Sequence, residues 1–303
     1  MPQQKNSPRS MGMYLASMTI FGTIGLFRRL IPLPSALVAF FRGIIGAAFL
    51  VAFVRLRGGA LRHGLSRRVA VRLALTGAII GVNWMLLFEA YNYTSVSIAT
   101  LCYYMQPTFV VLFSALVLRE RLGLRKGLCA LTALAGMVLV SGIPESGLPQ
   151  ARDLTGILLG LGAGACYAVI VLLNKSVHGA DAYEKTVIQL SAAALVLLPY
   201  LLLTGSFTAS SWSWGTVGLL LLVGILHTGL SYTLYFGAMD GLQTQTVALL
   251  SYLDPVIALF LSAALLHEAL SVLAVFGAVL ILGSAAVCEL GDAWAPYRKK
   301  GMS

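Results

Sequence analysis

The chain has 303 residues, of which 58% are hydrophobic and only 11% are charged, whereas soluble domains carry about 25% charged residues. With a mean hydropathy of +0.87, this composition excludes an ordinary soluble protein and predicts an all-α polytopic membrane protein. The formal net charge of +10 would indicate nucleic-acid binding in a soluble protein, but membrane topology explains the basic residues here. No G-x-x-x-x-G-K-[ST] motif occurs, so the chain does not carry its own P-loop ATPase.

Long apolar runs separated by short polar loops predict ten transmembrane helices. Residues 1–10 form a polar N-terminal tail, residues 143–153 form a linker rich in proline and glycine, and residues 291–303 form a polar C-terminal tail. The first half, 11–142, contains five predicted spans at about 11–27, 34–54, 73–90, 96–118 and 127–142. The second half, 154–290, contains five more at about 154–173, 186–204, 214–238, 245–266 and 271–290. Because the loops are short, we expect the helices to pack as one bundle.

Lysine and arginine residues are distributed unevenly between the two sides of the predicted membrane. With the N-terminus in the cytoplasm, 17 of the 21 basic residues fall on the cytoplasmic side. The opposite side receives Arg28, Arg29 and Arg152, and Arg42 lies inside a predicted helix. Because cytoplasmic loops are enriched in these residues, the distribution predicts a multi-pass protein of the inner (plasma) membrane with both termini in the cytoplasm.

The second half of the chain repeats the plan of the first at an offset of 148 positions, without a gap from Trp84 to Glu120. The matching positions are Trp84 with Tyr232, Phe88 with Phe236, Ala90 with Ala238, Gln106-Pro107 with Asp254-Pro255, and Glu120 with Glu268. Five spans per half is an odd number, so the second repeat enters the membrane upside-down relative to the first. Inverted repeats are typical of secondary transporters, which bind substrate near the midplane. Pro107 and Pro255 lie within their spans and predict helix breaks or hinges.

These residues resemble a known family of membrane proteins. The segments LFEAYNYTSVSIATLCYYMQPTFVVLFSALVLRERL and TVALLSYLDPVIALFLSAALLHEAL are similar to the two repeats of the EamA family in the drug/metabolite transporter superfamily, as is the arginine at position 42. The resemblance covers about residues 12–290 and is most specific from the third to the fifth span. It implies ten helices in two inverted five-helix repeats and a secondary transporter, often an exporter of amino acids or other small metabolites. It does not fix the substrate.

Three ionisable residues at membrane depth are candidates for function, because charge is costly there. Glu89, near the end of the third span, is a candidate to bind a substrate amine, to pair with Arg42 or to carry a proton. Arg42 is a candidate to bind a carboxylate through two parallel hydrogen bonds, or to serve as a structural tie to helix-end carbonyls or Glu89. Asp254, directly before Pro255, is a candidate ion-coupling site or a buried carboxylate capped by neighbouring hydroxyl groups.

Aromatic residues recur at matching depths of the two repeats. Facing a cavity, they would line a pocket for an aromatic side chain or a quaternary ammonium group, although many aromatic residues in membrane helices serve packing alone. The set predicted to bind substrate is Trp84, Tyr103, Tyr104, Tyr232 and Tyr252. Asn83 belongs to the same predicted site, and His227 is a candidate for ion coupling or a packing histidine. Glu120 and Glu268, at helix ends, are interpreted as structural ties.

The sequence therefore predicts a secondary active transporter of a small metabolite, in first place an amino acid exporter that works by alternating access, with protons as the candidate coupling ion. The alternative is an importer of choline or a similar quaternary ammonium compound, which would use Glu89 and the aromatic residues and leave Arg42 structural. A membrane enzyme or a receptor without transport is less favoured, since no catalytic, metal-binding or phosphate-binding motif is evident. We expect no cofactor, no metal and no nucleic acid partner, and a monomer or weak homodimer in the lipid bilayer.

Overall fold

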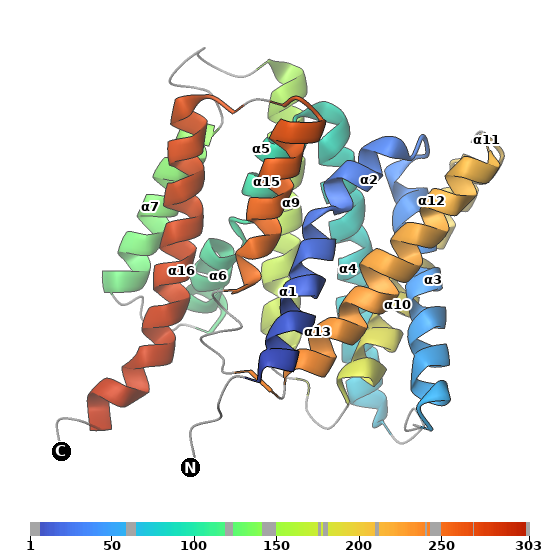
Figure 1. The fold of residues 1–303 in the computed structure, drawn as a ribbon, viewed down its shortest axis with the longest axis horizontal. Helices are drawn as coiled ribbons and strands as arrows, with labels where there is room; N and C mark the ends of the chain where they lie inside the picture. The colour runs from blue at the N-terminus through green and yellow to red at the C-terminus, as the bar shows by residue number, and fades with distance from the viewer. Residues whose placement is uncertain are drawn as a thin grey trace.

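The protein is a bundle of helices, without strands in the part of the chain that the structure describes (Figure 1). The structure is a computed structural model that describes residues 7–58, 65–118, 124–140, 150–174, 177, 181–209, 212–239, 241–242, 250–268 and 270–300. The first half forms α1 (Pro8–Gly22), α2 (Ile24–Leu30), α3 (Ser35–Leu56), α4 (Arg67–Tyr93), α5 (Val96–Tyr103), α6 (Gln106–Leu118) and α7 (Leu124–Val140). The second half forms α9 (Ala151–Asn174), α10 (Ala182–Leu203), α11 (Ser206–Ala209), α12 (Trp214–Gly224), the π-helix η1 (Ile225–Leu230), α13 (Ser231–Met239), α15 (Leu253–Leu265) and α16 (Val272–Lys300).

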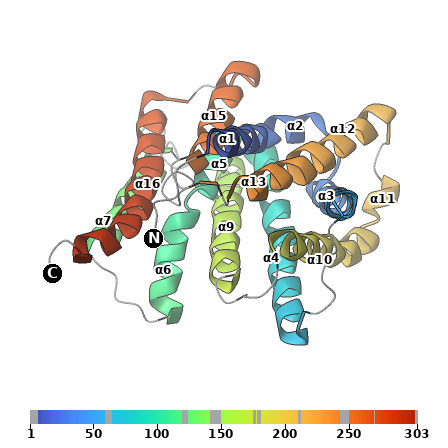
Figure 2. The same cartoon turned by 60° about the horizontal axis from the view of Figure 1, so that its bottom comes forward.

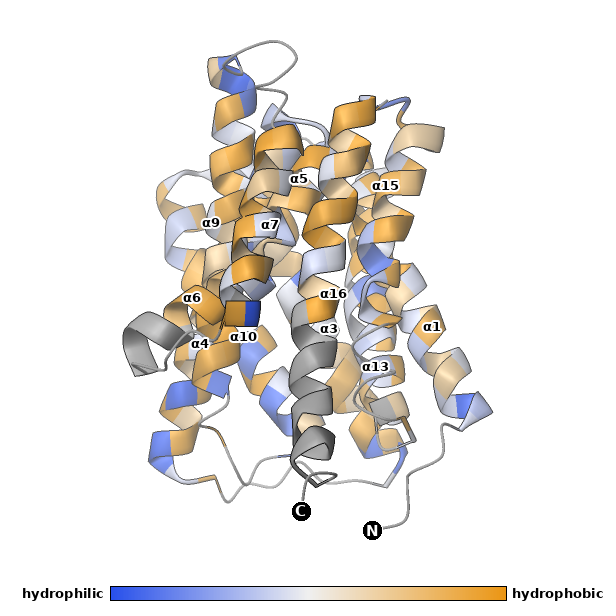
Figure 3. Cartoon of the chain, turned by 90° about the vertical axis from the view of Figure 1, so that its left-hand side faces the viewer, coloured by the Kyte–Doolittle hydropathy of each residue, from blue (hydrophilic) through white to orange (hydrophobic). Residues whose placement is uncertain are grey.

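The apolar helices match the predicted spans. Seven segments among the described residues are long and apolar enough to cross a membrane, and three shorter apolar helices bring the total to ten (7 + 3). This confirms the predicted all-α polytopic fold. The start of α1 and the end of α16 lie at the same end of the bundle, the lower end in Figure 1, as an even number of spans requires. Figure 3 shows hydrophobic residues along most of the helix length, with hydrophilic residues gathered toward the helix ends.

Two helices extend beyond the predicted spans. α4 begins before its apolar run because Ser66 caps it, with the Ser66 Oγ accepting a hydrogen bond from the Val69 N–H at 3.4 Å. α16 continues to Lys300 through most of the predicted C-terminal tail, since polar composition marks where a membrane ends and not where a helix ends. Glu120 and the linker residues 143–149 lie outside the described residues.

Several of the spans are interrupted. The first, predicted as one helix, divides at Thr23, whose hydroxyl and N–H both donate to the Ile20 carbonyl, at 2.7 and 3.1 Å. The fourth is interrupted at Tyr104 and Met105, two residues before Pro107, and the ninth has a turn at Tyr252, before Pro255. Proline removes a backbone donor, which favours a break in the preceding turn. The eighth span contains η1, a π-helical turn between α12 and α13.

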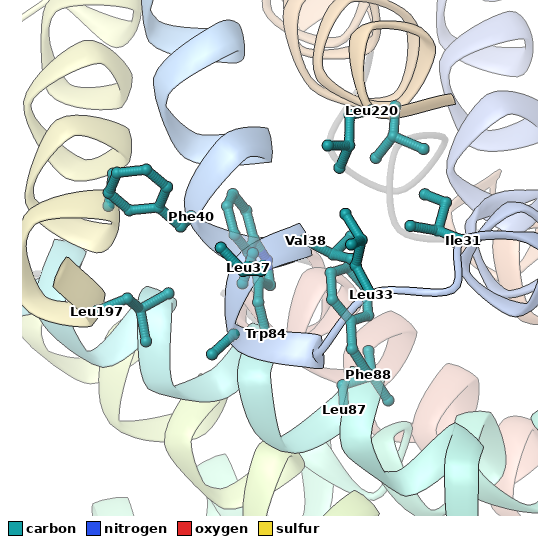
Figure 4. Close-up of a cluster of buried hydrophobic side chains, with 14 of the residues drawn as sticks. Ile31, Leu33, Leu37, Val38, Phe40, Trp84, Leu87, Phe88, Leu197 and Leu220 are labelled. Atoms are coloured by element: carbon teal, nitrogen blue, oxygen red, sulfur yellow. The ribbon is translucent and has the colours of Figure 1, made fainter. Parts of the chain in front are cut away.

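The bundle core lies around α3 and α4. Figure 2 shows α7 and α16 on one side, α3 and α10 on the other, and α4 and α9 between them. The largest buried cluster joins residues of α3, α4, α10 and α12. Figure 4 shows side chains of α3 facing those of α4 and of the second repeat. The labelled members are Ile31, Leu33, Leu37, Val38, Phe40, Trp84, Leu87, Phe88, Leu197 and Leu220. The two repeats therefore share one core.

Helices α7 and α16 approach each other closely at two glycines. A Cβ atom added to Gly136 would lie 2.7 Å from the carbonyl oxygen of Gly277, and one added to Gly277 would lie 2.6 Å from that of Gly136. Cβ atoms do not come this near to a carbonyl oxygen, so a side chain at either position would push the helices apart. Small residues at helix crossings allow such close packing in membranes.

We expect Gly277→Val to lower the melting temperature of the detergent-purified protein, because overpacking a close contact costs about 1–3 kcal/mol. Gly283→Val on the same helix is the matched control, since a Cβ at Gly283 would have no described atom within 4 Å. Thermal unfolding of both variants gives the comparison. Equal melting temperatures would contradict a close contact between α7 and α16.

Candidate functional site

A cavity of about 680 Å³ lies between the two repeats. Its lining comes from α1, α2, α3, α4, α5, α6, α9, α10, α13 and α15, with Tyr104 from the break between α5 and α6, and Ser251 preceding α15. Most of the lining is apolar or aromatic, and Arg42 and Asp254 are the charged residues among the described side chains that line it. A cavity with one cation and one carboxylate can complement a molecule that carries both charges.

Arg42 is buried in the membrane-depth part of α3, with 6% of its surface exposed. Its Nε donates a hydrogen bond of 2.8 Å to the Thr228 Oγ1 in η1. Its guanidinium carbon lies 4.2 Å from the ring centroid of Trp84 and 5.7 Å from that of Phe88. A guanidinium over an indole face is attracted by the negative face of the ring. The charge is therefore held by a hydroxyl at one edge and an aromatic face on one side.

Asp254 lies on the other repeat, in the first turn of α15. Its Oδ2 accepts a hydrogen bond of 2.6 Å from the Tyr104 hydroxyl, at the break between α5 and α6. The positive end of a helix dipole favours a carboxylate in a first turn. This hydrogen bond joins the interrupted fourth and ninth spans, so the two helix breaks meet at the cavity.

Aromatic rings form much of the cavity wall. Tyr103 contacts Tyr104 and Tyr167 with centroid separations of 5.7 and 5.9 Å, and Tyr232 stacks on Phe236 at 5.8 Å. Of the predicted substrate residues, the cavity brings together Arg42, Asn83, Trp84, Tyr103, Tyr104 and Tyr232. Tyr252, at the turn before α15, is not among the lining residues.

Glu89 lies outside the cavity lining, in a polar network at the end of α4. Its Oε2 accepts hydrogen bonds from the Ser35 hydroxyl at 2.6 Å and the Asn92 Nδ2 at 3.1 Å. Arg28 donates to the same Ser35 hydroxyl at 2.8 Å. The pairing of Glu89 with Arg42 that the sequence left open is not formed: Glu89 bonds Ser35 and Asn92, and Arg42 bonds Thr228.

Glu268 ties three segments at the same end of the bundle. Its Oε1 lies 2.8 Å from the Arg29 Nη2 in an ion pair, and its Oε2 accepts hydrogen bonds from the Val96 N–H at 2.7 Å and the Ser262 hydroxyl at 2.5 Å. Arg29 also donates to the Thr94 carbonyl at 3.0 Å. These contacts agree with the interpretation of Glu268 as a structural tie, and they close the end of the bundle opposite the first turn of α1.

The cavity extends toward the other end. Its lining includes Asn174, the last residue of α9, and Thr186, near the start of α10. The end of α9 and the start of α10 lie at the end of the bundle where α1 begins and α16 finishes (Figure 1). The cavity thus reaches from mid-depth to one side of the bundle, while polar networks close the opposite side.

His227 is fully buried in η1 and does not line the cavity. Its Nε2 lies 2.7 Å from the Thr23 Oγ1 at the break between α1 and α2, and its ring packs edge-on against Phe27 at 4.9 Å. Among the described residues no group of three His, Cys, Asp or Glu side chains is placed to hold a metal ion.

Sequence reasoning missed several residues of the site. Gln189 in α10 donates to the Thr76 hydroxyl and to the Asn174 Oδ1, both at 2.8 Å, and it lines the cavity with Tyr167. Polar residues within the apolar runs of α9 and α10 were the available signal. Thr228 offered no such signal, because its position depends on the π-helical turn.

A duplicated helical bundle around a cavity that holds two charged side chains and is closed at one end is the architecture of a secondary transporter. The chain belongs to the EamA-like transporter family, whose model matches residues 9–142 and 154–288. It is 31% identical to the uncharacterized transporter YxxF of Bacillus subtilis (strain 168), over 81% of this chain and 78% of that protein. It is 27% identical to the threonine/homoserine exporter RhtA of Escherichia coli (strain K12), over 92% of this chain and 88% of that protein.

A solved structure supports the fold. A crystal structure of a protein with 24% sequence identity superposes with a TM-score of 0.64 and covers 93% of this chain and 96% of that chain. The two family matches divide the chain into the two repeats predicted from the offset of 148 positions. The chain is therefore a multi-pass membrane transporter built from a duplicated unit.

We expect Glu268→Ala to lower the melting temperature clearly, because hydrogen bonds to a charged group are worth about 1.5–3 kcal/mol each. Arg29→Gln removes the ion pair but leaves the other two bonds of Glu268. Arg29 is 36% exposed, and exposed ion pairs contribute about 0–1 kcal/mol, so the effect is expected to be smaller. Thermal unfolding of both variants gives the comparison. If Arg29→Gln lowers the melting temperature as much as Glu268→Ala, the bonds of Glu268 to the Val96 N–H and the Ser262 hydroxyl do not stabilise this end of the bundle.

Proposed function

We propose that the protein is a secondary active transporter that exports an amino acid across the inner (plasma) membrane by alternating access. The observation that carries this proposal is the buried Arg42 in a cavity whose other charged lining residue, among those described, is Asp254. A guanidinium complements a carboxylate, and a carboxylate complements an ammonium group. Both charges of a zwitterionic amino acid would then have a partner.

Neutral polar groups add to the complementarity. Gln106 lines the cavity, and its Oε1 is buried without a hydrogen-bond partner among the described residues. An unsatisfied buried acceptor is costly, and a donor on the substrate would satisfy it. The name of the relative RhtA, a threonine/homoserine exporter, also favours an amino acid with a polar side chain.

In this proposal Asp254 takes the role that the sequence assigned first to Glu89. Asp254 lines the cavity and Glu89 does not. Asp254 would bind either the ammonium group of the substrate or a proton. Because both would use the same carboxylate, the transport of substrate would be coupled to the transport of protons. With the termini in the cytoplasm, as the distribution of basic residues predicts, the cavity would open to the cytoplasm and accept substrate for export.

The arrangement of Trp84 disfavours the alternative, uptake of choline. A quaternary ammonium group binds to the face of an aromatic ring. One face of Trp84 is covered by the Arg42 guanidinium at 4.2 Å, so an incoming cation would meet a positive charge at this ring. Tyr103 and Tyr232 supply further aromatic surface, and choline therefore belongs in the test.

The test is a thermal-shift screen of the detergent-purified protein against the twenty amino acids, choline, betaine and carnitine. A ligand at 100 times its Kd stabilises the folded state by about 2.7 kcal/mol, which is readily measured. We expect at least one amino acid to raise the melting temperature of the wild-type protein. Asp254→Asn and Arg42→Gln should abolish this shift.

The matched control is Glu89→Gln, which changes a carboxylate outside the cavity lining. It should retain the ligand-induced shift. Loss of the shift in Glu89→Gln with its retention in Asp254→Asn would contradict the assignment of the amine to Asp254. Stabilisation by choline alone would contradict the proposed substrate class.

A further inference from the structure

The hydrogen bonds of Arg42 are incomplete. Its Nε is bonded to Thr228 at 2.8 Å, but its two terminal nitrogens have no acceptor among the described residues. A guanidinium has five N–H donors, four of them on these terminal nitrogens. The side chain is 6% exposed, and it lines the cavity. The unused donors therefore mark a place for an anionic group.

The bond to Thr228 restricts how such a group can bind. A carboxylate binds an arginine with two parallel hydrogen bonds, either at the edge formed by the two terminal nitrogens or at the edge formed by Nε and one terminal nitrogen. Thr228 occupies the second edge, and Trp84 covers one face of the guanidinium. The edge formed by the two terminal nitrogens is the one that remains.

The π-helical turn η1 places Thr228 against Arg42. The Thr228 hydroxyl reaches back five residues to the Val223 carbonyl at 3.5 Å, and Ser231 does the same to Leu226 at 3.0 Å. Such a turn adds a residue to the helical repeat and is frequent at functional sites. α3 comes close to it at Gly46, where an added Cβ would lie 2.4 Å from the Thr228 Cγ2.

The opposite side of η1 is fixed by the first span. The Ser17 hydroxyl donates to the Ser231 carbonyl at 3.0 Å, and the His227 Nε2 lies 2.7 Å from the Thr23 Oγ1. The π-helical turn is thus held between α1 and α3. Since a longer helical turn shifts the direction of each following side chain, we attribute the contact between Thr228 and Arg42 to this turn.

We propose that Thr228 is a positioning residue that sets substrate specificity: it holds Arg42 so that the two terminal nitrogens bind the substrate carboxylate end-on. This inference rests on the proposed function for the presence of a carboxylate in the cavity. Beyond the proposed function, it assigns to Thr228 the preference of the cavity for a carboxylate over a neutral amide. An amide offers one oxygen acceptor, so it cannot satisfy both parallel bonds.

The experiment measures the affinity of the detergent-purified protein for L-threonine, L-threoninamide and L-lactate by calorimetry. Lactate keeps the carboxylate and lacks the amine, whereas threoninamide keeps the amine and lacks the carboxylate. We expect the wild-type protein to bind threonine at least about tenfold more tightly than threoninamide, since a charged hydrogen bond is involved. Thr228→Val should reduce this preference to about twofold or less, and Thr228→Ser should restore it.

Thr233→Val is the matched control. Thr233 is also a buried threonine of the eighth span, and its hydroxyl donates to the Gly229 carbonyl at 2.9 Å, without contacting Arg42. Thr233→Val should keep the wild-type preference for threonine over threoninamide. A general loss of packing would reduce this preference in Thr233→Val and Thr228→Val alike. If Thr228→Val does not fold, Thr228→Ala provides the same comparison with less crowding at Gly46.

The outcomes separate this inference from the proposed function. If the wild-type protein binds lactate but not threonine, and Thr228→Val loses the binding of lactate, the carboxylate site is supported and the amino acid is overturned as substrate. Equal binding of threonine and threoninamide by the wild-type protein would overturn the carboxylate site and leave an amino-group transporter. An unchanged preference in Thr228→Val would overturn the role of Thr228, and so would binding of none of the three compounds.

Discussion

The buried guanidinium of Arg42 is the constraint on which the rest of the site depends. A charge at membrane depth is costly unless it is paired or hydrogen-bonded, and no carboxylate among the described residues forms an ion pair with it. Trp84 offers a ring face, Thr228 offers one acceptor, and the cavity lies at the remaining edge. The two terminal nitrogens of Arg42 are thus without an acceptor among the described residues, and in the function we propose a substrate carboxylate binds them.

The differences between the two repeats define the chemistry of the cavity. The matched helix breaks before Pro107 and Pro255 bring position 106 and position 254 to the same cavity, but one is the neutral Gln106 and the other is Asp254. Tyr104 of the first repeat bonds Asp254 of the second at 2.6 Å. The duplication supplies a symmetric frame with two interrupted helices. Single substitutions within that frame supply the separate charges.

The sequence predicted the ten spans and the duplication, because hydropathy and the repeat offset report on which segments cross the membrane. Six of the eight residues predicted to bind substrate line the cavity, but most of the other lining residues were not predicted. Spacing along a helix fixes the angle between two side chains, but it does not tell which face of the helix meets the cavity. Trp84 lines the cavity, but Glu89 is five residues further along α4 and so lies about 140° around the helix, where it bonds Ser35. Thr228 was missed because a π-helical turn has no sequence signature in an apolar span and changes the direction of the residues after it.

Solute counterflow in proteoliposomes tests the central claim, that the cavity carries a zwitterion, and it does not require knowledge of the coupling ion. Vesicles containing the purified protein would be preloaded with unlabelled L-threonine, L-threoninamide or choline and then supplied with labelled L-threonine outside. We expect transient accumulation of the label in vesicles preloaded with threonine and none in those preloaded with threoninamide or choline. Accumulation driven equally well by choline or threoninamide would contradict a site that requires both charges.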